Sequence, residues 1–264
     1  MKNKYVFILC PHYQGSTIIL NLLNSSNKVS SFSHINKVGE GTTLFPRVGI
    51  HNFNIWENGY DPNYFLDLKK VKEAYDLEWD YNKPILVEKC PLLISRAQEI
   101  EAYFSKFGEV YFIISIRSPY STDQYLNNTW VTTALAQKEN IENLQNKIIT
   151  TYEQICLYPE LVIKKIQKKL PELDDLSLEI KKIELKYKNN KNNKNNEHNK
   201  NNENNKNNEN NENNENNEKK TKTGERQLKI HKDKVYRIKD KEIKNKFLIN
   251  HKDILTYFSY KYIE

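Results

Sequence analysis

The sequence has little of what disulfide-rich, zinc-binding and membrane-spanning proteins need. Its 264 residues include only three cysteines, Cys10, Cys90 and Cys156, and an odd number spaced this widely argues against a disulfide framework and a zinc site. No apolar run approaches the roughly 18 residues that a membrane span needs. The first apolar run, residues 5–10, is also too short for the core of a secretory signal. We therefore expect a cytoplasmic protein with no membrane span and no bound metal.

Most of the chain carries no net positive charge. Residues 1–187 carry equal numbers of basic and acidic side chains, whereas residues 221–264 hold 12 basic and 6 acidic ones. A basic C-terminal segment can face a phosphorylated ligand, nucleic acid or an acidic surface, or it can be a solvated lysine-rich face. Because no aromatic residues are interleaved with the basic ones as in RNA-recognition segments, nucleic acid is not an expected partner.

Residues 188–220 repeat Asn-Asn-Lys and then Asn-Asn-Glu. This tract has too little apolar content to fold, so we expect a disordered insertion on the surface. Self-association, which Asn-rich tracts can mediate, is the alternative. Apolar residues resume after the tract, and we therefore predict one domain that is formed by residues 1–187 and 221–264 and interrupted by the insertion.

The rest of the sequence alternates strand patterns with helix patterns. Apolar, β-branched runs predict strands at residues 4–10, 84–87, 109–116 and 147–151. Continuous apolar strands are typical of a parallel sheet that is covered on both faces. Helices are expected at residues 18–23, 63–75, 92–104, from about 120, 140–146 and 159–170. The alternation predicts an α/β fold with a mainly parallel central sheet flanked by helices.

The turn after the first strand, Pro-His-Tyr-Gln-Gly-Ser-Thr at residues 11–17, has the chemistry of an anion site. A helix N-terminus presents unpaired N–H groups and the positive end of its dipole. Gly15 lets the backbone approach a phosphate, and Ser16 and Thr17 add hydroxyl donors. The pattern GxxxxGK[ST] is absent because no lysine follows Gly15, which argues against an ATP or GTP hydrolase and against a small-molecule kinase. The simpler alternative is a strand-to-helix turn capped by Ser16.

Four segments, taken in order, resemble the sulfotransferase family, whose donor is 3′-phosphoadenosine 5′-phosphosulfate. Residues 5–20 resemble the loop that binds the 5′-phosphosulfate, and Phe-Ile-Ile-Ser-Ile-Arg-Ser-Pro-Tyr at 112–120 resembles the 3′-phosphate motif. Thr-Thr-Tyr-Glu-Gln-Ile at 150–155 is similar to the family's strand ending in Tyr-Glu-Asp-Leu. Residues 255–263 are similar to its closing helix and Phe-Gly-Tyr. The resemblance implies a P-loop NTPase-like sulfotransferase fold.

Two further stretches resemble the branch of protein-tyrosine sulfotransferases and their bacterial relatives. Val-Gly-Glu at residues 38–40 stands where that branch has Gly-Glu, which implies Glu40 as catalytic base. Val-Glu-Lys-Cys-Pro at residues 87–91 implies that Lys89 lies near the transferring sulfuryl group. His12, in the anion loop, is a reserve catalytic candidate. The alternative to these catalytic roles is that Lys89 is a surface lysine and Glu40 is a solvated carboxylate in a loop.

The resemblance also assigns the donor site. Arg117, at the end of a strand, is expected to clamp the 3′-phosphate with its planar guanidinium, although it could be an ordinary strand-end charge. Ser121 and Tyr125 are expected to add hydroxyl groups there. The 5′ loop comprises Tyr13, Gln14, Gly15, Ser16 and Thr17. The resemblance also implies an acceptor that is a hydroxyl or amine of a small molecule or peptide.

The sequence departs from the family at two of these places. Tyr13 and Gln14 precede Gly15, where the family has an arginine or lysine, and Tyr125 stands where it has a serine. A missing cation weakens stabilisation of the transition state unless His12 or Lys89 compensates. The alternative function is therefore a catalytically degenerate sulfotransferase-like domain that binds a nucleotide or a partner.

Overall fold

The computed structural model describes residues 3–36, 38–51, 61, 64–121, 128–178, 247 and 250–259, without the side chains of residues 92, 121, 128 and 129. These residues all belong to one compact unit, Met1–Leu185 with Arg226–Glu264. The insertion predicted at residues 188–220 lies outside the described residues.

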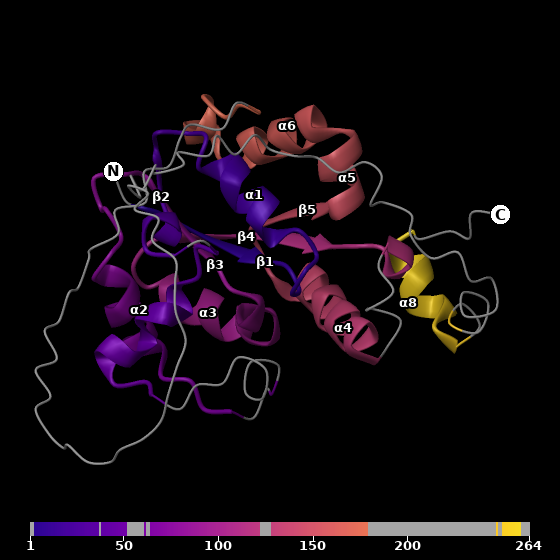
Figure 1. The fold of residues 1–264 in the computed structure, drawn as a ribbon, viewed down its shortest axis with the longest axis horizontal. Helices are drawn as coiled ribbons and strands as arrows, with labels where there is room; N and C mark the ends of the chain where they lie inside the picture. Colours follow the sequence, from indigo (N-terminus) through magenta and orange to yellow (C-terminus); the bar gives the residue numbers. More distant parts are fainter. Residues whose placement is uncertain are drawn as a thin grey trace, which may run out of the picture. The chain divides into compact units, whose positions relative to one another are not determined.

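A five-stranded sheet forms the centre of the unit (Figure 1). Its strands are β1 (Lys4–Leu9), β2 (Val29–Ser30), β3 (Ile85–Lys89), β4 (Glu109–Ile116) and β5 (Lys147–Thr151). They lie in the order β2-β3-β1-β4-β5, and every neighbouring pair is parallel. The prediction of an α/β fold with a parallel central sheet is confirmed, and four of the strands are those that the sequence predicted.

Helices cover both faces of the sheet, which explains why its strands are apolar throughout (Figure 1). One face carries α1 (Ser16–Leu23), α5 (Tyr152–Leu157) and α6 (Pro159–Lys169), and the other carries α2 (Leu68–Asp76), α3 (Ala97–Phe104) and α4 (Asn128–Asn143). Alternate residues of a strand point to opposite faces. In β1, Val6 and Ile8 pack with α1 and α6, whereas Tyr5 and Phe7 pack with α2 and α3.

Several predicted helices differ from the observed ones at their ends. The helix predicted at 63–75 is α2, which starts only at Leu68 because the Asp67 side chain accepts hydrogen bonds from the N–H groups of Lys69 and Lys70 and caps it there. The helix predicted at 92–104 is split into a 3-10 helix, Pro91–Arg96, and α3. The helix predicted at 140–146 is the end of the longer α4.

Residues 28–60 show no strand or helix pattern in the sequence, but the segment contains regular structure where it is described. It forms β2 and two 3-10 helices, Phe32–His34 and Gly41–Val48. Further 3-10 helices are Pro119–Ser121 and Pro171–Leu173. β2 has only two residues, too few for a hydrophobic pattern to reveal it.

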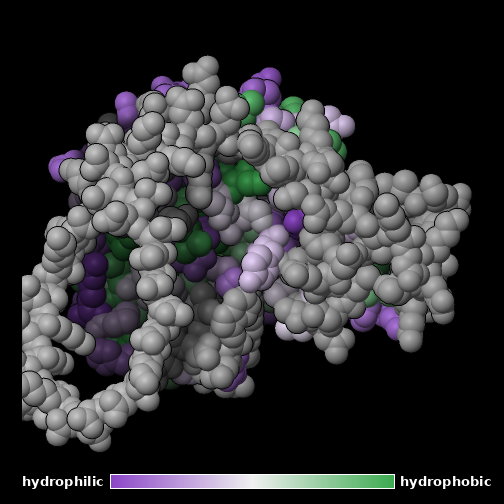
Figure 2. Space-filling view, in the orientation of Figure 1, coloured by the Kyte–Doolittle hydropathy of each residue, from purple (hydrophilic) through white to green (hydrophobic). Residues whose placement is uncertain are grey.

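The amphipathic helix predicted at 159–170 is α6. Val162, Ile163 and Ile166 are buried, whereas the apolar Leu161 is 56% exposed. Hydrophobic and hydrophilic side chains accordingly lie side by side on the outer surface over α6 (Figure 2). Among the described helices none has the length and apolar character that crossing a bilayer requires.

A last helix, α8 (Lys252–Tyr257), packs against α4. Ile254 and Leu255 of α8 share a hydrophobic cluster with Trp130 of α4. The Phe247 ring joins this cluster, with its centroid 5.8 Å from that of the Trp130 ring.

Candidate functional site

The carboxyl ends of three neighbouring strands carry most of the predicted site residues. The loop at residues 10–15 follows β1, Lys89 ends β3, and Arg117 follows β4. The connection from β1 leads to α1 on one face, whereas those from β3 and β4 lead to α3 and α4 on the other face. Strand ends at such a reversal are where open α/β sheets bind their ligands.

The loop after β1 delivers the start of α1 in an unusual backbone conformation. Gly15 is the N-cap residue with φ of 101°, and Tyr13 has φ of 60°. Within the described part of the chain, the N–H groups of Gly15 and Thr17 donate no hydrogen bond, and the Ser16 N–H contacts the Cys10 sulfur. The hydroxyls of Ser16 and Thr17 likewise bond to no described residue. The first turn of α1 therefore offers donors that suit an anion.

Gly15 is required for a second reason, which is close packing. A Cβ atom at this position would lie 2.5 Å from Cδ2 of Tyr152. Tyr152 is the first residue of α5, which begins after β5 because Thr151 caps it by accepting a bond from the Gln154 N–H. On the Tyr152 ring lies the guanidinium of Arg117, whose Cζ is 4.1 Å from the ring centroid.

Arg117 is tied to the loop by two hydrogen bonds. Its backbone N–H donates to Oε1 of Gln14 at 2.9 Å, and its Nη1 donates to the carbonyl oxygen of Tyr13 at 3.3 Å. Gln14 is 1% exposed and Arg117 is 7% exposed, whereas the Tyr13 side chain is exposed. The buried Gln14 therefore joins the loop to β4, and the Tyr13 ring does not line the buried part of the site.

Lys89 and Glu40 form a buried ion pair with Nζ and Oε1 2.8 Å apart. Their side chains are 3% and 15% exposed, so neither the surface lysine nor the solvated carboxylate of the simpler interpretations describes them. A charge pair in such surroundings interacts more strongly than one in water.

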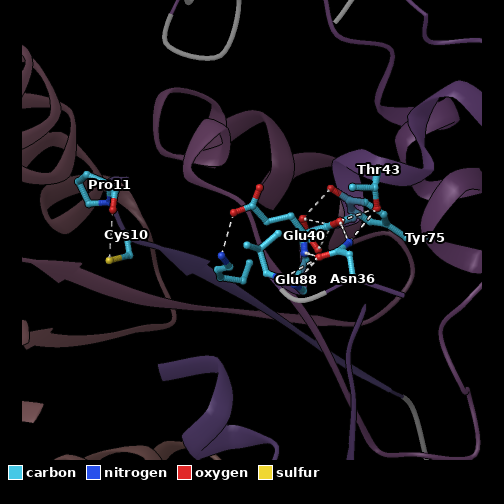
Figure 3. Close-up of polar contacts among 11 residues, drawn as sticks. Cys10, Pro11, Asn36, Glu40, Thr43, Tyr75 and Glu88 are labelled. Atoms are coloured by element: carbon cyan, nitrogen blue, oxygen red, sulfur yellow. Dashed lines mark hydrogen bonds and ion pairs between the residues drawn. The ribbon is translucent and has the colours of Figure 1, made fainter. Parts of the chain in front are cut away.

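Asn36 holds the loop that carries Glu40 (Figure 3). Its Oδ1 accepts bonds from the N–H groups of Gly39, at 2.6 Å, and Glu40, at 3.3 Å. Its Nδ2 donates to the Glu40 carbonyl at 3.1 Å and to Oγ1 of Thr43 at 3.0 Å. The carboxylate of Glu40 is thus presented by a loop that is fixed on both sides.

Glu88, next to Lys89, is a fully buried carboxyl group that the sequence did not predict. Both of its oxygens lie 3.1 Å from the N–H of Gly41, and the Tyr75 hydroxyl donates to Oε1 at 3.4 Å (Figure 3). Burial raises the pKa of Glu88 to about 8, the Gly41 N–H opposes this shift and the Glu40 carboxylate adds to it. Two consecutive residues of one loop therefore contact two consecutive residues of β3. Glu40 forms an ion pair with Lys89, and the Gly41 N–H bonds to Glu88.

His12 lies within electrostatic reach of this pair. Burial lowers the pKa of His12, the Glu40 carboxylate opposes the shift, and the Lys89 ammonium adds to it. Cys10 directly follows β1. The positive charges of Lys89 and Arg117 lower the pKa of its thiol, but burial has the larger effect and raises that pKa to about 12. The β1 end therefore lies between the two cations, and the thiol stays protonated and unreactive.

Other residues that the sequence did not predict also support this edge. Nε2 of Gln137 on α4 donates to the carbonyl oxygens of Leu9, at 2.7 Å, and Ser115, at 2.9 Å. Glu153 accepts a bond from the Ser118 N–H at 2.9 Å. Glu153 stands in the Tyr-Glu motif quoted above, and Glu88 stands in the Val-Glu-Lys-Cys-Pro stretch, but no sequence pattern marks Gln137 or Asn36.

Two predicted site residues remain without a structural account. Tyr125 lies outside the described residues, and of Ser121 only the backbone, at the end of a 3-10 helix, is described. The three cysteines are free buried thiols. The described ranges contain no group of His, Cys, Asp and Glu side chains arranged to hold a metal ion.

No protein-family model matches the chain, and neither does any curated protein. Among solved structures, the chain is similar to the sulfotransferase domain of the Synechococcus PCC 7002 olefin synthase, with 16% identity and a TM-score of 0.39 over 65% of this chain and 74% of that one. It is also similar to the sulfotransferase domain of the curacin biosynthetic pathway, with 14% identity and a TM-score of 0.40 over 64% and 74%. Both neighbours are sulfotransferase domains.

Proposed function

We propose that this protein binds 3′-phosphoadenosine 5′-phosphosulfate at the carboxyl edge of its sheet and transfers the sulfuryl group to a hydroxyl or amine. One observation carries the proposal. Three neighbouring strands bring together the donor-rich start of α1, the buried Lys89–Glu40 pair and Arg117. Anion-binding donors beside a cation and a carboxylate are the groups that transfer of an anionic group needs.

The residues present fit an anionic nucleotide. The N–H groups of Gly15 and Thr17 donate to no described residue, and Gly15 leaves the backbone open to close approach. No lysine follows Gly15, so the loop lacks the residue with which P-loop hydrolases hold ATP or GTP. The choice of the phosphosulfate donor rests on the resemblance of the sequence to sulfotransferases.

The chain's own residues divide the chemical work. When bound, the donor supplies an activated sulfuryl group. The first turn of α1 binds its 5′-phosphate through N–H groups and hydroxyls. Glu40 accepts the proton from the acceptor's hydroxyl or amine, and Lys89 stabilises negative charge on the transferring and leaving oxygens. Burial makes the Lys89 charge effective, since little water screens it.

The binding-only alternative has an observation in its favour. The position before Gln14 that carries a cation in the family is Tyr13, and its side chain is 67% exposed. A domain that binds the nucleotide without transfer would share every feature of the loop but would not depend on Glu40.

Turnover separates these alternatives. The protein is incubated with the phosphosulfate donor and a panel of hydroxyl and amine acceptors, and release of 3′-phosphoadenosine 5′-phosphate is measured. We expect acceptor-dependent release that falls at least about 100-fold in Glu40→Gln and Lys89→Met, because general-base and electrostatic groups contribute at this level.

Lys70→Met serves as the matched control, because Lys70 is exposed on α2. This variant should release 3′-phosphoadenosine 5′-phosphate at the rate of the wild type. Nucleotide binding without release would favour the binding-only domain. Absence of both binding and release would show that the proposal is wrong.

A further inference from the structure

We propose that Arg117 supplies the anion loop with the cation that the loop's own sequence lacks, and so binds the 5′-phosphate side of the nucleotide. This inference rests on the proposed function and deepens it. It differs from the 3′-phosphate role that the sequence resemblance implies for Arg117.

The sequence around the loop holds no positive charge. No lysine or arginine lies between Lys4 and Lys28. A helix N-terminus alone offers about half an elementary charge. An anionic group on the first turn of α1 therefore needs a cation from another element.

Arg117 comes from the strand next to β1, and two of its hydrogen bonds lead to the loop. In the sheet, Leu9 of β1 pairs with Ile114 of β4, so the residues that follow the two strands emerge side by side. From there the Arg117 N–H reaches Gln14 and its Nη1 reaches the Tyr13 carbonyl. Both partners belong to the loop that precedes α1.

Tyr152 fixes the guanidinium beside Gly15. One ring lies against both groups, since the Arg117 Cζ is 4.1 Å from its centroid and the Gly15 backbone leaves no room for a Cβ beside it. Stacking on an aromatic face leaves the edge of a guanidinium able to donate to an oxyanion. The three groups form one unit at the start of α1, where the 5′-phosphate is expected.

Binding measurements on nucleotides that differ in one phosphate test the assignment. The wild type and Arg117→Gln are titrated with 3′-phosphoadenosine 5′-phosphate, and adenosine 5′-phosphate and adenosine 3′-phosphate are measured by competition against it. We expect Arg117→Gln to weaken the first two by a similar factor, about 10- to 100-fold, since a hydrogen bond to a charged group contributes at this level. Adenosine 3′-phosphate should bind as in the wild type.

Arg47→Gln is the control for the loss of one positive charge, because Arg47 is half exposed and pairs with Glu78. It should leave all three affinities unchanged, and thermal melting shows that both variants are folded. If Arg117→Gln binds adenosine 3′-phosphate more weakly but adenosine 5′-phosphate as tightly as the wild type, Arg117 contacts the 3′-phosphate and the inference is wrong.

An equal loss for all three ligands would also overturn the inference, because Arg117 would then act only by shaping the loop. A wild type that binds none of the ligands would instead refute the proposed function, and with it the inference. A failure of the proposed function is thus distinguished from a failure of the inference alone.

Discussion

At the scale of single residues, Glu88 is the least expected feature of the molecule. A carboxyl group with no exposed surface is costly to ionise, even though the Gly41 and Lys89 N–H groups and the Tyr75 hydroxyl lie against it. Burial therefore raises the pKa of Glu88 to about 8. At neutral pH the group is mostly protonated in the folded state and ionised in the unfolded state.

This difference predicts how stability depends on pH. Because the folded state holds the proton more tightly, the contribution of Glu88 to the free energy of unfolding falls as pH rises from about 4.5 to about 8 and is constant above that range. Glu88→Gln keeps an oxygen for the Gly41 N–H and removes the ionisation. The variant should gain stability relative to the wild type between pH 5 and pH 9, by on the order of 4 kcal/mol.

Chemical denaturation at pH 5, 7 and 9 measures this change. Glu160→Gln is the control, because Glu160 is exposed on α6 and should leave the pH dependence of the wild type unaltered. If Glu88→Gln and the wild type lose stability in parallel across this range, Glu88 does not titrate as described.

The sequence predicted site residues where their types carry chemistry. Lys89 and Glu40 were assigned separately, from two motifs, and the structure joins them in one ion pair. Asn36 and Tyr152 could not be assigned in the same way. Asn36 acts by wrapping the residues that follow it around its amide, which no motif marks. Tyr152 acts by touching Gly15 and Arg117, and this effect depends on contacts across the fold rather than on neighbours in sequence.

At the scale of elements, the β1–loop–α1 unit decides whether an anion can bind. Gly15 combines a left-handed backbone with contact to the Tyr152 ring. Gly49 has a similar backbone, with φ of 78°, but a Cβ at its position would meet nothing within 4 Å. A side chain at Gly49 would therefore cost only backbone strain, whereas a side chain at Gly15 would cost backbone strain and a steric clash with Tyr152.

Alanine substitutions at both glycines test this distinction. Gly49→Ala should lose about 1 kcal/mol of stability, through the strain of a left-handed alanine. Gly15→Ala should lose a further ~1–3 kcal/mol through overpacking against Tyr152, and it should weaken binding of 3′-phosphoadenosine 5′-phosphate at least tenfold. Denaturation and calorimetry measure these losses. Equal stability losses in the two variants would contradict the close packing at Gly15.

Elements were predictable where a long hydrophobic pattern marks them. β1 and β4 are apolar because helices cover both faces of the sheet, and the sequence located both. β2 escaped notice because it has two residues. α4 was predicted as two helices, from about residue 120 and at 140–146, because polar residues such as Gln137, which is buried against carbonyl groups, interrupt its hydrophobic pattern. Patterns of hydrophobicity cannot show that a polar side chain is satisfied inside the fold.

At the scale of the whole molecule, we propose that residues 1–187 and 221–264 form a single domain. The cluster of α8 with Trp130 supports this, because Phe247, Ile254 and Leu255 bury hydrophobic surface on α4. A chain that ends after residue 187 should melt at a lower temperature than the full chain, with Trp130 exposed to water and its fluorescence shifted to the red. An unchanged melting curve would show that the C-terminal segment is not part of the domain.

The proposed function requires the start of α1 to bind the phosphate of the donor nucleotide. Nuclear magnetic resonance on the labelled full chain, titrated with 3′-phosphoadenosine 5′-phosphate, tests it most directly. We expect saturable shifts of the Gly15, Ser16 and Thr17 amide resonances, with those of α6 unchanged and with no comparable response to ATP. Amide resonances at the start of α1 that stay in place, or shifts confined to another surface, would contradict it.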